Sequence, residues 1–148
     1  MRWVTRERPK VDRIACPWLI RRFIDPEADI VYVPADQVLA VAERDGGYSF
    51  DARGATYSHR KQPDGTEWCT FETLINVYQI HDPALVELAR IVHAADVAAD
   101  VRSHPFGAAV RAIGDAGARV EADDQVLLER GLFVYDALYA YCQREAQS

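Results

Sequence analysis

The second half of the chain carries apolar residues at the three- and four-residue spacing of an amphipathic helix, which limits the folds open to it. One helix is expected from Asp82-Pro83, where aspartate caps the first turn and proline tolerates the first helical position. A shorter helix is expected after Pro105, ended by Gly114–Gly117, and the last over Ala122–Glu145. The residues expected to face the core are Leu85, Leu88, Val92, Ala95, Phe106, Val110, Ile113, Leu128, Leu132, Tyr135, Leu138, Tyr139 and Cys142.

The first half has a different pattern, in which short β-branched and aromatic runs alternate with turn residues. A helix is expected to start at Pro17 and to end at Asp25-Pro26, because proline suits a first turn and disfavours helix before it. The chain therefore predicts an α+β fold, a small sheet from the N-terminal half packed against a mostly helical C-terminal half, as one domain over residues 1–148. Strands are expected at Arg2–Thr5 and Ile30–Val33, a hairpin at Tyr48–Asp51 with Ala55–His59, a turn at Pro63–Gly65, and helices over Gln37–Arg44 and Phe71–Ile80, the latter capped by Thr70.

The composition indicates a cytoplasmic location. No apolar run approaches the ~20 residues of a membrane helix, and the charged start MRWVTRERPK is not followed by the apolar segment of a secretory signal. The three cysteines, Cys16, Cys69 and Cys142, are odd in number and widely spaced. In a reducing compartment they are expected to be free thiols.

The net charge of −6 argues against sequence-independent binding to nucleic acid. Seven basic residues fall within the first 22, however, so the chain is unevenly charged. These residues form either a solvated face or a surface for an anion or a partner. A P-loop, a nucleophile elbow and a Gly-rich dinucleotide fingerprint are all missing from the sequence.

Histidine and carboxylate residues in three neighbouring segments predict a metal site. His59 ends a predicted strand, Glu72 lies in a first helical turn, and His93 and Asp96 are three apart on the next helix, where they share a face. Imidazole and carboxylate together suit a divalent ion of iron, manganese or zinc. We therefore expect His59, Glu72 and His93 to be ligands, with Asp96 either a fourth ligand or a hydrogen-bond partner.

Other roles for the same residues stay open. Glu72 also suits the positive end of a helix dipole, and His93 with Asp96 also suits a surface pair. Cys69 would favour zinc or iron if it turned toward the site, and Asp51 is a further candidate for orienting a histidine. The remaining histidines, His81 and His104, lie at expected helix boundaries and are expected at the surface.

A second cluster lies in VDRIACPWLIRRFID. Cys16 would stand near a helix start, where exposed N–H groups lower the pKa of a thiol. Asp12, Arg13, Cys16 and Arg22 are therefore expected to line a pocket for a small oxyanion. The alternative is a small buried cysteine with arginines paired to surface acids.

Several of these strings resemble the bacterial chromate-resistance protein family. They are TRERPKVDRIACPWLIRRFIDPEA, YVP, FD, SH, CTFE, DPAL and IVHAAD, in that order between Trp3 and Asp96. More closely, the sequence looks like the C-terminal domain of the chromate-sensing regulators of chromate-resistance operons. The resemblance implies a link to chromate-dependent control of an efflux transporter. Full-length members carry a basic N-terminal region thought to contact DNA. This chain begins at the domain and has a net negative charge, so we expect a stand-alone version of the domain here.

Two hypotheses follow. In the first, a metal next to an oxyanion pocket serves chromate or oxidative-stress resistance, through sensing or through metal-dependent chemistry on a small oxyanion. In the second, the domain is a ligand-sensing or dimerisation module without turnover. The C-terminal apolar stripe would then form a homodimer contact.

Overall fold

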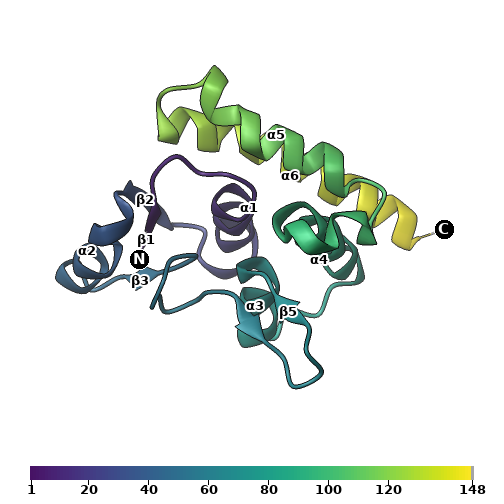
Figure 1. The fold of residues 1–148 in the computed structure, drawn as a ribbon, viewed down its shortest axis with the longest axis horizontal. Helices are drawn as coiled ribbons and strands as arrows, with labels where there is room; N and C mark the ends of the chain where they lie inside the picture. The colour runs from purple at the N-terminus through teal and green to yellow at the C-terminus, as the bar shows by residue number, and fades with distance from the viewer. Residues whose placement is uncertain (148) are drawn as a thin grey trace.

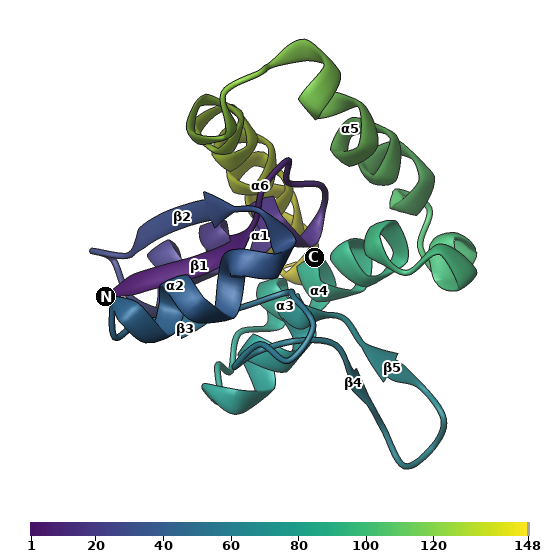
Figure 2. The same cartoon turned by 60° about the vertical axis from the view of Figure 1, so that its left-hand side comes forward.

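A three-stranded parallel sheet organises the first half of the protein. The computed structural model describes residues 1–147, and β1 (Arg2–Arg6) lies between β2 (Asp29–Val33) and β3 (Tyr48–Ser49) (Figures 1 and 2). Trp3 pairs with Ile30 on one side and with Tyr48 on the other. Parallel strands need crossover connections, and here helices provide them.

Helices cover both faces of the sheet. Successive residues of a strand point to opposite faces, so Trp3 joins the main core with α1 (Asp12–Leu19), while Val4 packs with Val38 and Ala42 on the other side. These last two belong to α2 (Val38–Arg44), which follows the 3₁₀ turn η2 (Ala35–Gln37). In Figure 2, α2 lies in front of the sheet and α1 behind it.

The first helix starts five residues earlier than expected. It begins at Asp12, with Pro17 inside it, and continues as a π-helical segment, η1 (Ile20–Ile24). Pro17 has no N–H to donate to the carbonyl of Arg13, but the hydroxyl of Tyr32 donates to that carbonyl at 2.7 Å. The tertiary contact therefore satisfies the group that proline leaves unpaired.

The predicted hairpin of residues 48–51 with 55–59 is wrong. Phe50 and Tyr57 form an isolated parallel bridge, and β3 pairs with β1 instead. Asp51, with φ of 49°, turns the chain away from the sheet. The antiparallel hairpin comes next, formed by β4 (Arg60–Lys61) and β5 (Glu67–Trp68) around the expected turn at Pro63–Gly65, and it extends from the body in Figure 2.

The second half is helical, as expected, and the α+β fold class is confirmed. Its central helix is α4 (Pro83–Asp96), which packs against α5 (Gly107–Val120) and α6 (Asp124–Ala146). Asp82 caps α4 as predicted, accepting from the N–H groups of Ala84 and Leu85. The shorter elements are α3 (Thr70–Val77) and the 3₁₀ segment η3 (Ala98–Ser103). The N-cap residue of α3 is Cys69, not Thr70 as expected.

Gly114–Gly117 does not end a helix, since α5 runs through it to Val120. A Cβ atom at Gly114 would lie 2.6 Å from Cγ2 of Val11, so that glycine allows a close approach between segments. Ile113, expected inward, is 56% exposed. Within residues 1–147, none of the helices combines the length and the apolar character needed to cross a membrane.

Candidate metal centre

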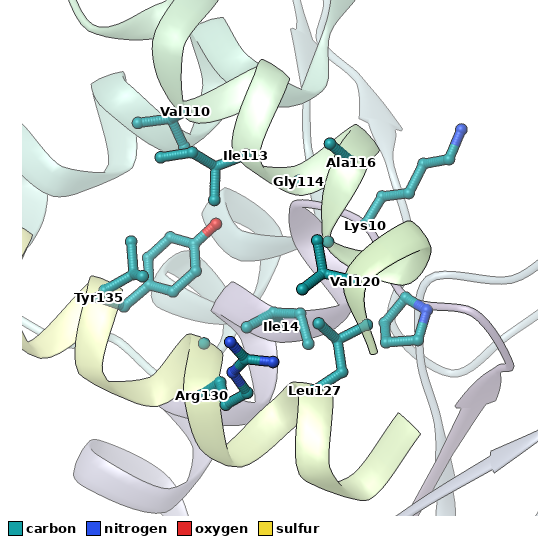
Figure 3. Close-up of a pocket in the computed structure, with 14 residues that line it drawn as sticks. Lys10, Ile14, Val110, Ile113, Gly114, Ala116, Val120, Leu127, Arg130 and Tyr135 are labelled. Carbon is teal, nitrogen blue, oxygen red and sulfur yellow. The ribbon is translucent and has the colours of Figure 1, made fainter. Parts of the chain in front are cut away.

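A groove of about 420 Å³ between α5 and α6 is lined mainly by apolar side chains and does not match the predicted metal site (Figure 3). Ile14, Val110 and Leu127 are among the side chains around it, and Lys10 and Arg130 are its charged members. It contains no carboxylate, imidazole or thiol. The residues of types that can bind a metal ion lie elsewhere, in two separate groups.

The first group, the His59 cluster, consists of Asp12, His59 and Asp96. Nε2 of His59 lies 3.0 Å from Oδ2 of Asp96, 3.4 Å from Oδ2 of Asp12 and 3.6 Å from Oδ1 of Asp51. Three carboxylate oxygens from different segments therefore converge on one nitrogen. A single N–H cannot donate well to all three at once.

Two helix ends position the acids of the His59 cluster. Asp12 is in the first turn of α1, and its Oδ2 accepts the backbone N–H of Thr70 at the start of α3 (2.8 Å). The partial positive charge of a helix N-terminus favours a carboxylate there. Asp96 is the last residue of α4. The cluster thus joins the two halves of the fold.

Asp51 lies beside the same cluster, with one carboxylate oxygen near His59. Its backbone is in the left-handed region, which aspartate tolerates better than most residues. Its Oδ1 accepts the hydroxyl of Thr70 at 2.7 Å. Its Oδ2 lies 3.1 Å from Arg6 and 3.5 Å from the buried Arg13. Arg13 also donates to the carbonyls of Arg6 and Glu7, so its guanidinium is used to hold the backbone.

Burial and like charges make the His59 cluster retain protons. Desolvation, with the nearby Asp96 carboxylate, raises the pKa of Asp12 to about 8. The carboxylates of Asp12 and Asp96 raise the pKa of His59 to about 11. The shift of the His59 pKa reflects an excess of negative charge that a cation would neutralise, whereas the shift of the Asp12 pKa comes first from burial. The side chain of His59 is 34% exposed, so the cluster can be reached from solvent.

The second group, the Cys69 cluster, consists of Cys69, Glu72 and His93. Nδ1 of His93 lies 2.5 Å from Oε1 of Glu72, and Nε2 lies 2.7 Å from Oδ2 of Asp100. The same Glu72 oxygen accepts the backbone N–H of Cys69 at 2.9 Å. Burial opposes protonation of His93, but its hydrogen bonds to Asp100 and Glu72 outweigh that effect and raise its pKa.

The four residues predicted as one metal site are therefore divided in two. His59 and Asp96 belong to one cluster, and Glu72 and His93 to the other. His93 and Asp96 do neighbour each other on α4, as the spacing predicted, but each contacts a different partner segment.

Comparison with known proteins connects this chain with the chromate-resistance family that its sequence resembles. Residues 3–142 match the family described as ChrB, C-terminal domain. The chain is also 34% identical over 140 residues to Protein ChrB of Cupriavidus metallidurans, covering 94% of this chain and 40% of that protein. The chain belongs to the ChrB C-terminal domain family. No solved structure matches it.

The ChrB-family strings are not all placed where the sequence suggested. Arg22 lies outside the His59 cluster, because it pairs with Asp136 on α6 at 2.9 Å. Cys16 lies inside α1 rather than at a helix start, and its Sγ is 3.8 Å from Oδ1 of Asp12. Burial, reinforced by Asp12, raises the pKa of this thiol, contrary to the expected lowering. All three cysteines are free and buried.

Sequence reasoning missed three features of this ChrB-family domain. Arg6 and Arg53 line a hollow beside His59, and Asp100 contacts His93. Asp100 lies in η3, beyond the end of α4 at Asp96, so its contact with His93 does not follow from helical spacing along α4. His104, expected at the surface, is buried: its ring contacts Glu87 at 3.0 Å and accepts the N–H of Phe106.

Proposed function

We propose that this domain serves chromate resistance through a divalent metal ion bound in the His59 cluster. The observation that carries the proposal is the convergence of Asp12, Asp51 and Asp96 oxygens on Nε2 of His59. One imidazole proton serves one of these oxygens at a time, whereas a metal ion coordinates several together. One nitrogen with two or three carboxylate oxygens suits manganese or iron and is compatible with zinc.

A hollow of about 300 Å³ beside His59 supports an oxyanion ligand. Arg6, Arg53 and Ser58 line it together with the imidazole and with Asp51, to which Arg6 donates. Chromate is a tetrahedral dianion, and guanidinium groups bind such anions through paired N–H groups. A divalent ion would bring two positive charges where the imidazole proton brings one, which favours an anion further.

The protein's own groups would fix the ligands before the metal arrives. Thr70 holds Asp12 through its N–H and Asp51 through its hydroxyl. Arg13 holds Asp51 from the buried side. When bound, the metal would offer an open coordination position to water or to an oxyanion. A metal-dependent enzyme and a binding-only sensor both need this arrangement.

Metal content of the purified and reconstituted protein tests the proposal. We expect about one equivalent of manganese or iron in the wild type and its loss in His59→Ala. His81→Ala is the matched control, because His81 is exposed and belongs to neither cluster. Unchanged manganese or iron in His59→Ala would refute the metal assignment. Turnover assays on chromate with the loaded protein then separate an enzyme from a sensor.

A further inference from the structure

The Cys69 cluster lies apart from the site just proposed and has a different donor set. We propose that Cys69, Glu72 and His93 form a second metal site, one that takes zinc or a similar thiophilic ion. The two clusters share no side chain. Sulfur and imidazole donors select softer ions than the oxygen-rich His59 cluster does. The domain would therefore sort two kinds of metal ion between two sites.

The donor geometry is already close to that of a zinc site. The ligand atoms of Cys69, Glu72 and His93 lie within 4.8 Å of one another. Zinc bonds of roughly 2.0–2.3 Å in a tetrahedron place donors roughly 3.3–3.8 Å apart. Nδ1 of His93 and Oε1 of Glu72, now hydrogen-bonded at 2.5 Å, would have to move apart to admit the ion. Both side chains are partly exposed, which leaves room for that rotation.

The orientation of the His93 ring is that of a metal ligand. Its Nε2 donates a hydrogen bond to Asp100 at 2.7 Å, and its Nδ1 faces Glu72. An ion bound at Nδ1 would replace the proton that lies between Nδ1 and Glu72, while Asp100 would keep the ring oriented. Metal-bound histidines characteristically donate their other N–H to a carboxylate in this way.

The position of Cys69 is also better explained by a metal than by the helix. It is the N-cap residue of α3, where serine, threonine, aspartate or asparagine are the preferred residues. Its backbone N–H donates to Glu72, and its side chain faces the backbone N–H of Glu72 in a capping box. A hydroxyl or a carboxylate would serve that capping role better than sulfur, yet it is a thiol that is buried here beside a carboxylate and an imidazole.

Access to the cluster comes from a cleft of about 660 Å³. Glu72, His93 and Asp100 line it, together with Glu67 and Trp68 of β5. An ion that entered there would displace the proton of the buried Cys69 thiol, whose pKa is raised by burial, and would keep a coordination position toward the cleft. One thiolate and one carboxylate would neutralise a divalent ion, so the buried charge is balanced.

Cobalt substitution tests the second site, because Co²⁺ bound to a thiolate absorbs in the near ultraviolet. We expect a sulfur-to-cobalt band in the wild type, its loss in Cys69→Ser, and at least tenfold weaker Co²⁺ binding in His93→Gln. Cys16→Ser is the matched control for a second buried thiol and should keep the band. Circular dichroism verifies that each variant folds. Because His93 is partly exposed, its substitution tests the site without disturbing the core.

The two proposals fail separately. His59→Ala should keep the cobalt–thiolate band while losing manganese, and Cys69→Ser should do the reverse. A folded Cys69→Ser protein that retains the band, or a wild type that binds Co²⁺ without one, would overturn the second site. Neither result would affect the His59 cluster.

Discussion

At the scale of single residues, the carboxylate of Asp12 both stabilises the fold and belongs to the candidate metal site. It is 1% exposed, accepts the backbone N–H of Thr70, and lies within contact distance of Cys16 and His59. A buried acid in this setting is stable in its neutral form or when paired with a cation. The metal-free domain must therefore hold protons that an unfolded chain would release.

This leads to a prediction about pH. The pKa of Asp12 is raised to about 8, above its value of about 3.9 in an unfolded chain, so the native state binds the extra proton. Stability is then full below about pH 4 and falls as pH rises toward about 8, by up to ~1.4 kcal/mol per pH unit for that proton. The raised pKa of His59 acts in the same direction and extends the loss toward about pH 11.

Asp12→Asn should flatten this dependence, since asparagine is neutral and its oxygen can still accept the N–H of Thr70. Urea unfolding of metal-free protein at about pH 6 and about pH 9 measures the slope. Equal slopes in the variant and the wild type would show that Asp12 does not hold the proton.

At the scale of elements, the crossing of α1 and α6 depends on one glycine. A Cβ atom at Gly131 would lie 2.4 Å from Cγ2 of Ile14. Gly131→Ala should therefore destabilise the domain by about 1–3 kcal/mol, as overpacking of a core does.

Gly117→Ala is the control for this crossing, because its Cβ would meet only the flexible end of Leu127, at 3.1 Å. It should leave stability unchanged or raise it by up to about 1 kcal/mol through helix propensity. Denaturant midpoints compare the two variants. Similar midpoints for both would mean that the α1–α6 contact adjusts to the added methyl group.

The elements that local sequence could predict are those whose pattern is long. The stripes of α4 and α6 run over several turns, and Leu85, Leu88, Leu128 and Leu132 are buried as expected. β3 has only two residues, and its parallel partner β1 is some 45 positions away, so no local signal specified it. The helix boundaries predicted at Pro17 and Gly114 were wrong for a related reason, because each depends on a contact outside the local sequence. Tyr32 donates to the carbonyl that Pro17 leaves unpaired, and Gly114 allows the close approach of Val11.

The candidate site was predictable in its residue types but not in its grouping. Histidine beside carboxylate indicated metal chemistry, and both clusters contain that pair. Spacing along α4 could not show that His93 faces α3 while Asp96 faces the segment of His59. The pairing of Arg22 with Asp136 spans 114 positions and lay equally beyond local reasoning.

At the scale of the whole molecule, the His59 cluster draws on both halves of the fold. Asp12 comes from the crossover helix of the sheet, His59 from the segment between β3 and β4, and Asp96 from the end of the central helix α4. An ion that binds all three therefore cross-links the sheet layer to the helical layer. Its binding energy becomes folding energy, because an unfolded chain offers no such site.

Metal should consequently protect the whole domain against unfolding. At 100 times its Kd, Mn²⁺ should add about 2.7 kcal/mol to the free energy of unfolding, a rise in Tm of roughly 5–10 °C for a domain of this size. Asp96→Asn should abolish most of that rise. Asp115→Asn, at an exposed i,i+4 pair on α5, should keep it. Because the metal displaces protons from the cluster, the rise should grow with pH between about 6 and 8. Calorimetry with and without Mn²⁺ measures these shifts, and equal protection of Asp96→Asn would mean that the ion binds elsewhere.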